Sequence, residues 1–139
     1  MSEPRITGLL ESSLYVADLK KSSAFYRELF GFTTLFADER MAALEVPGRQ
    51  VLLLFRQGGT AEAVSGPSGT IPPHDATGRI HCAFSIGVDA LDDWRGRLAT
   101  AGIAVEAETR WPRGGTSLYF RDPDGHLLEL ATPGLWWPA

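Results

Sequence analysis

The strongest constraint on the fold is an internal repeat, because one order of strands and a single helix occurs twice along the chain. In each half a short apolar segment precedes a helical pattern, a glycine and three further strand-like segments. Pairing Glu11 with His81 and Gly48 with Gly125 gives offsets of 70 and 77 residues. A whole supersecondary unit repeated in this way predicts an α+β protein built from two βαβββ modules.

Period-two apolar patterns and turn residues place the strands of each module. The predicted strands are residues 9–17, 32–40, 41–47 and 50–56 in the first module and 79–87, 103–111, 116–122 and 126–132 in the second. Each helix follows its module's first strand: Asp18 is the expected N-cap and Gly31 the C-cap of one, and Asp89 and Gly102 cap the other.

The two modules, residues 6–57 and 79–132, are expected to form one domain that spans 6–135. A stretch rich in Gly, Pro and Ser, residues 58–78, joins them as a loop, linker or lid. One helix covers one face of four strands, so the other face stays open. Two modules side by side would form a curved mixed sheet with a concave cavity for a metal or ligand.

Alternation along the strands predicts which side chains reach that open face. Apolar residues expected on the helix side are Leu10, Leu14, Val16, Ile80, Cys82, Phe84, Ile86, Leu128 and Leu130. The open face is expected to carry Glu11, Ser13, Tyr15, His81, Ala83, Ser85, Leu127 and Glu129. Polar groups able to bind a cation thus lie on three different strands of the cavity.

Composition excludes several other classes of protein. The formal charge is −4, from 13 Lys and Arg against 17 Asp and Glu, which provides no basic surface for nucleic acid. The apolar run 51–55 is far shorter than the roughly 20 residues of a membrane span. The single cysteine, Cys82, cannot form an intrachain disulfide, and the N-terminus lacks a signal-peptide pattern. We expect a cytoplasmic protein with a small-molecule partner.

Three segments resemble the vicinal oxygen chelate superfamily: LYVADLKKSSAFYRELFGF, HCAFSI and SLYFRDPDGHLLEL. This superfamily includes glyoxalase I, fosfomycin-resistance transferases, extradiol dioxygenases, methylmalonyl-CoA epimerase and bleomycin-resistance proteins. The similarity covers residues 8–132, and DPDGHLLEL is its most specific part. The resemblance implies that Glu11, His81 and Glu129 bind a divalent metal ion. The identity of this ion is left open among Zn, Ni, Mn and Fe.

Two positions depart from the commonest pattern of that superfamily. Glu11 stands where the first ligand is usually His and sometimes Gln. Leu53 or its neighbour Leu54 occupies the position of a further carboxylate ligand in glyoxalase I. One imidazole and two carboxylates still form a reasonable set for a divalent cation, but little glyoxalase I activity is expected.

Several other residues are candidates for contacts with substrate. Arg113 could hold a carboxylate or phosphate through a bidentate contact. Ser117 and Tyr119 share a strand face, and the similar SxYF segment of fosfomycin-resistance proteins contributes to their substrate pocket. His74 belongs to the loop and would reach the cavity only if that loop closes over it. His126 alternates away from the open face and is discounted as a ligand.

The resemblance implies a metal-dependent small-molecule enzyme that performs Lewis-acid lyase, isomerase or group-transfer chemistry on an oxygenated substrate. One alternative is an extradiol-type dioxygenase, which normally uses two His and one carboxylate on Fe(II), so Glu11 argues against it. Another is a non-catalytic drug-binding protein of the bleomycin-resistance type, which needs no metal. The resemblance also implies a homodimer, in which Glu11 of one subunit could complete the site of the other.

Overall fold

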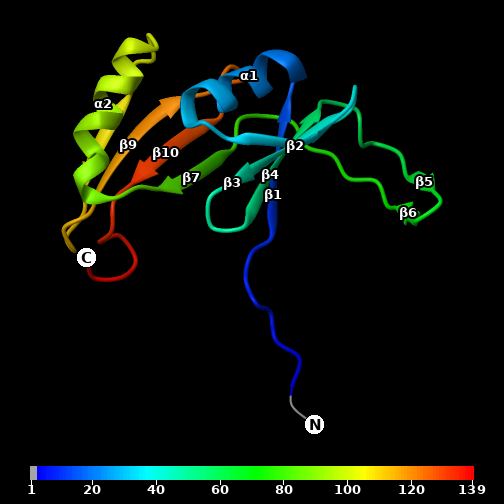
Figure 1. The fold of residues 1–139 in the computed structure, drawn as a ribbon, viewed down its shortest axis with the longest axis horizontal. Coiled ribbons are helices and arrows are strands. Elements are labelled where there is room, and N and C mark those ends of the chain that lie inside the picture. Colours follow the sequence, from blue (N-terminus) through cyan, green and yellow to red (C-terminus); the bar gives the residue numbers. More distant parts are fainter. Residues whose placement is uncertain (1–2) are drawn as a thin grey trace. The chain divides into compact units, whose positions relative to one another are not determined.

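The computed structural model describes residues 3–139, which divide into a first unit that ends at Thr77 and a second, Gly78–Ala139 (Figure 1). The predicted βαβββ order is present in both, so the α+β class is confirmed. Hydrogen bonding divides the eight main strands into two sheets of four. The loop residues 58–77 belong to the first unit.

The first unit contains one four-stranded sheet, one helix and a small hairpin. Its elements are β1 (Glu11–Val16), α1 (Leu19–Phe30), β2 (Thr33–Ala37), β3 (Met41–Val46), β4 (Gln50–Arg56), β5 (Val64–Gly66) and β6 (Gly69–Ile71). The sheet order is β1-β4-β3-β2, with β1 parallel to β4 and the other pairs antiparallel. The two-stranded β5-β6 hairpin lies in the stretch that the sequence analysis describes as a loop.

Helix α1 begins and ends where capping chemistry predicts. The Asp18 side chain accepts the backbone N–H of Lys21, and Gly31 ends the helix in the left-handed conformation at φ 74°. Tyr26 and Leu29 of α1 are buried, as are the helix-side residues Leu14, Val16, Leu44, Leu52 and Leu54 of the sheet. Leu10 was expected among them but is exposed, because β1 begins only at Glu11.

The second unit repeats this plan. Its elements are β7 (His81–Ser85), the 3-10 turn η1 (Val88–Ala90), α2 (Leu91–Thr100), β8 (Ala107–Arg110), β9 (Thr116–Arg121) and β10 (Leu127–Ala131). The sheet order is β7-β10-β9-β8, with β7 parallel to β10 and the other pairs antiparallel. Its core is formed by Leu98 of α2 and by Leu118, Phe120, Leu128 and Leu130 of the sheet.

The start of α2 differs from the prediction. Asp89 was expected to be the N-cap, but it lies inside η1, and α2 begins after Ala90 without a side-chain cap. Asp92 and Asp93 in the first turn of α2 instead place negative charge near the positive end of the helix dipole. At the other end Gly102 follows the cap residue Ala101 and adopts φ 72°.

The strand registers agree with the internal repeat residue by residue. In the first sheet Glu11 pairs with Val51 and Ser13 with Leu53. In the second, His81 pairs with Leu127 and Ala83 with Glu129. Glu11 and His81 therefore occupy equivalent places in their sheets, and so do Leu53 and Glu129.

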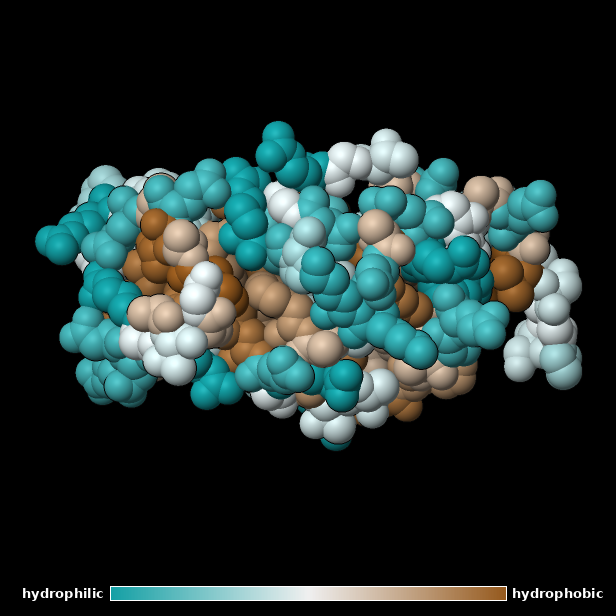
Figure 2. Space-filling view, turned by 90° about the horizontal axis from the view of Figure 1, so that it is seen from above, coloured by the Kyte–Doolittle hydropathy of each residue, from teal (hydrophilic) through white to brown (hydrophobic). Residues whose placement is uncertain are grey.

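The surface is mostly hydrophilic on the side seen in Figure 2, with smaller apolar areas between the polar side chains. Among the residues that the structure describes, no helix is long and apolar enough to cross a membrane.

Candidate metal centre

A histidine and a glutamate meet on the open face of the second sheet. His81 begins β7 and Glu129 lies in the middle of β10, and the parallel register puts their side chains on the same face. The Nε2 atom of His81 is 3.1 Å from Oε1 of Glu129. The imidazole is about half exposed, whereas the carboxylate is buried at 5% exposure. A buried carboxylate requires a partner that compensates its lost hydration.

Hydrogen bonding determines which nitrogen of His81 carries a proton. Nδ1 lies 2.8 Å from the carbonyl oxygen of Leu127, which can only accept, so Nδ1 donates. In a neutral imidazole Nε2 then has only its lone pair, and this lone pair faces a carboxylate oxygen. Two acceptors facing each other require a positive charge between them, either a proton or a metal ion.

The spacing of these two atoms fits a metal ion. Two ligand atoms that are each about 2.1 Å from one ion and at a right angle to each other are about 3.0 Å apart. The 3.1 Å between Nε2 and Oε1 agrees with this value. A carbonyl that orients the imidazole through Nδ1 is also the usual support of a metal-binding histidine. His81 and Glu129 therefore fit a divalent cation as neighbouring ligands.

A chain of hydrogen bonds supports the other oxygen of Glu129. The Ser117 hydroxyl donates to Oε2 of Glu129 at 2.5 Å, and Nε1 of Trp111 donates to the same hydroxyl at 2.8 Å. Ser117 is fully buried on β9, and Trp111 begins the turn between β8 and β9. The sequence analysis missed Trp111, and only its place at the start of the WPRGG turn, five residues before β9 begins, could have indicated a link to Ser117.

Tyr119 and Arg113, both predicted to contact substrate, are placed differently in the second unit. Tyr119 pairs with Glu129 across β9 and β10, and its ring centroid is 6.4 Å from that of His81. Arg113 lies in the exposed turn and donates from Nη1 to the carbonyl of Leu135 at 3.3 Å. Tyr119 thus borders the His81 and Glu129 pair, while Arg113 contacts the C-terminal segment.

The third predicted ligand, Glu11, belongs to the first unit. It lies exposed at the start of β1. Leu53 occupies the place in the first sheet that Glu129 occupies in the second, so the first unit lacks a matching pair of ligands. Over residues 3–139 the structure contains no group of three His, Cys, Asp or Glu side chains arranged to hold an ion.

His126 lies on the core side, in agreement with its rejection as a ligand. It is 1% exposed, and its Nδ1 accepts the backbone N–H of Ile80 at 3.0 Å. Its own backbone N–H donates to Oδ1 of Asp122 at 2.8 Å. His126 therefore helps to close the turn between β9 and β10 and to attach it to the start of β7.

His74 anchors the segment 58–77 to the first sheet. Its Nδ1 is hydrogen-bonded to the Tyr15 hydroxyl, and the Thr60 hydroxyl donates to its carbonyl at 2.5 Å. Its ring also meets that of Phe55 edge-on, with centroids 4.8 Å apart. Tyr15 was expected on the open face, but these contacts leave it only 7% exposed.

The single cysteine takes no part in the centre. Cys82 alternates with His81 along β7 and is half-buried on the helix side. Burial raises the pKa of its thiol, so the reactive thiolate is disfavoured at neutral pH.

Comparison with known proteins shows the family of the chain. Residues 8–130 match the Glyoxalase/Bleomycin resistance protein/Dioxygenase superfamily, and the chain belongs to it. It is 31% identical over 133 residues to the metallothiol transferase FosB of Shouchella clausii, covering 91% of this chain and 81% of the relative. It is 30% identical over 118 residues to the glutathione transferase FosA of Serratia marcescens, covering 85% and 75%.

A solved structure with the same fold is that of a lactoylglutathione lyase from Agrobacterium tumefaciens. The TM-score is 0.86 at 33% sequence identity, and the alignment covers 96% of this chain and 98% of that one.

Proposed function

We propose that the protein is a metal-dependent enzyme that acts on a small oxygenated molecule. His81 and Glu129 bind the divalent cation, and Glu11 supplies a third ligand, proposed from its sequence position alone. The observation that carries the proposal is the 3.1 Å between Nε2 of His81 and a buried carboxylate oxygen of Glu129, which is the spacing of two neighbouring ligands. The relatives named as a metallothiol transferase and a glutathione transferase support metal-dependent group transfer.

When bound, a divalent cation such as Zn²⁺, Ni²⁺, Mn²⁺ or Fe²⁺ supplies Lewis-acid polarisation of two adjacent oxygens of a substrate. The residues of the chain prepare the site for this chemistry. The Leu127 carbonyl holds the His81 ring, and the Ser117 hydroxyl holds Glu129. Tyr119 is proposed to donate its phenolic proton in a hydrogen bond to a substrate oxygen, and the position of its ring beside that of His81 supports this. Ser117 is proposed to act indirectly, by orienting Glu129. Arg113 remains a candidate for contact with an anionic group of the substrate.

Group transfer, lyase or isomerase chemistry is favoured over oxygen insertion. The usual Fe(II) dioxygenase centre has two His and one carboxylate, whereas the ligand set proposed here has one His and two carboxylates. Leu53 in place of the further carboxylate argues against turnover of a glyoxalase I substrate. In a drug-binding protein without a metal, His81 and Glu129 would form only an ion pair on the open face.

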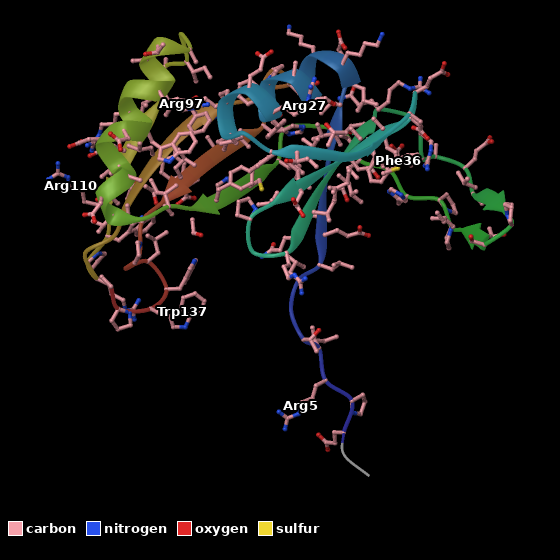
Figure 3. All side chains as sticks on the ribbon, viewed as in Figure 1. Arg5, Arg27, Phe36, Arg97, Arg110 and Trp137 are labelled. Atoms are coloured by element: carbon pink, nitrogen blue, oxygen red, sulfur yellow. The ribbon has the colours of Figure 1, made fainter. Side chains whose placement is uncertain are left out.

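The protein is further proposed to be a cytoplasmic homodimer. Large apolar side chains are exposed near both ends of the chain: Ile6 at 91%, Leu9 at 68%, Trp136 at 79% and Trp137 at 77%. Figure 3 shows Trp137 on the C-terminal loop and Arg5 on the extended N-terminal segment. Trp136 and Trp137 are adjacent in sequence, and contiguous exposed apolar patches are typical of surfaces that contact another protein.

The test measures bound metal first and activity second. Purified protein is dialysed against Zn²⁺, Ni²⁺, Mn²⁺ or Fe²⁺, and the retained metal is determined by elemental analysis. Each loaded form is then assayed with an epoxide plus a thiol, with α-hydroxy substrates and with catechols. We expect retained metal and turnover of the first or second group of substrates. Failure to retain any of the four metals, or Fe²⁺-dependent cleavage of a catechol, would overturn the proposal.

A further inference from the structure

We propose that Ser117 and Trp111 make Glu129 a ligand through one oxygen only, and that this selects small divalent cations over Ca²⁺. The proposal rests on the proposed function, because it assumes that His81 and Glu129 bind an ion. Ser117 and Trp111 are positioning residues in it, since both act through Glu129.

The chemistry of each side chain determines the direction of the hydrogen bonds that run from Trp111 through Ser117 to Glu129. The indole Nε1 of Trp111 can only donate, so the Ser117 oxygen accepts that bond. A serine hydroxyl has one proton, and the ionised Glu129 carboxylate can only accept it. Oε2 of Glu129 is therefore the acceptor at the end of the chain, while Oε1 faces His81.

Burial prevents water from replacing these bonds. Ser117 has no exposed surface, and Glu129 has only 5% of its surface exposed. If the carboxylate rotated to turn Oε2 toward an ion, the short bond from the buried Ser117 hydroxyl to Oε2 would be stretched or broken. An unpaired buried donor is costly, so the carboxylate is held with only Oε1 toward His81.

The fold of the WPRGG turn explains why Trp111 reaches Ser117. The backbone N–H of Trp111 donates to the Gly115 carbonyl at 2.8 Å, and the N–H of Gly114 donates back to the Trp111 carbonyl at 2.9 Å. A Cβ on Gly115 would lie 2.8 Å from the carbonyl oxygen of Pro133, so the C-terminal segment packs directly on this turn. The turn thereby brings the indole back beside β9.

One oxygen and one imidazole nitrogen suit a small ion better than Ca²⁺. Ca²⁺ takes about six to eight oxygen ligands at about 2.3 to 2.6 Å, commonly with both oxygens of a carboxylate. Zn²⁺ and similar first-row ions accept imidazole nitrogen and fewer ligands at shorter distances. Holding Oε2 away from the ion therefore removes one of the oxygens that Ca²⁺ needs.

The experiment compares the affinities of the full-length protein for Mn²⁺ and Ca²⁺. Mn²⁺ binding is followed by electron paramagnetic resonance, and Ca²⁺ is measured as a competitor. The variants are Ser117→Ala, Trp111→Phe and the double variant, with Ser117→Thr as a conservative rescue that keeps the hydroxyl. Ser85→Ala, on β7 of the same sheet, and Trp94→Phe, on α2, are the matched controls.

We expect Ser117→Ala to lower the ratio of Mn²⁺ to Ca²⁺ affinity about tenfold, the usual scale for a supporting residue of a metal ligand. Trp111→Phe should lower the ratio less, and the double variant should match Ser117→Ala, because Trp111 acts through Ser117. Ser117→Thr and both controls should keep the wild-type ratio.

Four outcomes are decisive. An unchanged ratio in folded Ser117→Ala would overturn the proposal, as would an equal loss in Ser85→Ala. Additive effects of the two single variants would show that Trp111 does not act through Ser117. Wild-type protein that binds neither ion would instead overturn the proposed function itself. If circular dichroism shows that Ser117→Ala does not fold, Trp111→Phe and Ser117→Thr still test the proposal, since a wild-type ratio in Trp111→Phe would contradict it.

Discussion

At the scale of single residues, Glu129 carries most of the chemistry in the candidate centre. It is nearly buried, and its two oxygens have different partners, Oε1 toward His81 and Oε2 toward Ser117. The burial of a charged group is favourable only when such partners are present. Its role therefore depends on contacts that a solvent-exposed glutamate would not make.

Replacing this carboxylate should remove the stabilisation that metal provides. In wild-type protein an ion at about 100 times its Kd should add about 2.7 kcal/mol to the free energy of unfolding. Glu129→Gln keeps the size and an acceptor oxygen but loses the charge, so most of that gain should vanish. Thermal unfolding with and without Mn²⁺ measures it, and Glu45→Gln is the control because Glu45 is exposed on β3 of the first unit. A full gain in Glu129→Gln would contradict the assignment.

At the scale of elements, His74 illustrates how a segment without a long helix or strand is ordered. Its Nδ1 bonds the Tyr15 hydroxyl, and its backbone exchanges two hydrogen bonds with Thr60: the His74 N–H donates to the Thr60 carbonyl at 2.9 Å, and the Thr60 hydroxyl donates back. Thr60 is 1% exposed, so these bonds lie on the covered side of the segment. The segment around the β5-β6 hairpin is thus attached to β1 through a few polar contacts.

Removing the tyrosine hydroxyl should loosen this attachment. Tyr15→Phe deletes the hydroxyl that bonds His74 Nδ1 and accepts from Thr60 at 3.3 Å, and it should lower the free energy of opening the segment by about 1 kcal/mol. Limited proteolysis within residues 61–71 should then become several times faster, while the metal affinity of the second unit is unchanged. Tyr119→Phe provides the matched control. Equal cleavage of Tyr15→Phe and wild type would show that His74 does not anchor the segment.

Two ion pairs of the second sheet predict the acid dependence of stability. Hydrogen bonds from Arg121 and Arg95 lower the pKa of Glu106 and Glu108, respectively. A carboxyl group with a lowered pKa in the folded state contributes stability above its unfolded pKa, and loses it as the pH falls through the lowered value. The contribution should therefore be complete near neutral pH, decline as the pH falls below about 4.3, the usual pKa of glutamate, and disappear below the lowered pKa of the folded state.

The double variant Glu106→Gln, Glu108→Gln measures this contribution. Urea unfolding should show it less stable than wild type between about pH 5 and 8, with the difference shrinking as the pH falls below about 4.3. Both glutamates are partly exposed, so salt should reduce the difference. A difference that stays constant down to the lowest pH would show that the ion pairs are not its source.

At the scale of the whole molecule, the third ligand can be tested by mixing subunits. Light scattering should give a particle of about twice the chain mass of 15.1 kDa. If Glu11 completes the centre of the other subunit, refolding Glu11→Ala together with His81→Ala should restore about one intact centre per mixed dimer. Each variant alone should bind little metal. A stable monomer at micromolar concentration would contradict the dimer, and no recovery on mixing would contradict a shared centre.

The sequence by itself determined the features that depend on local periodicity and turn chemistry. Alternation along a strand assigns His81 and Glu129 to one face, and the structure has both side chains on that face. Asp18 and Gly31 cap α1 as expected because a cap involves only the residues next to it. The family pattern then indicated which residues on the open face to propose as ligands of an ion.

Only the tertiary structure decided the contacts between residues that are distant in sequence or separated by a turn. The alternating pattern predicted Tyr15 on the open face of the sheet. In the structure Thr60 and His74, more than forty residues further along the chain, cover its side chain. Alternation placed Ser117 on the face of Tyr119, but only the packed turn showed that it bonds both Trp111 and Glu129. The physical reason is that hydrogen-bond partners depend on how close two segments approach, and a pattern along one segment carries no information about that distance.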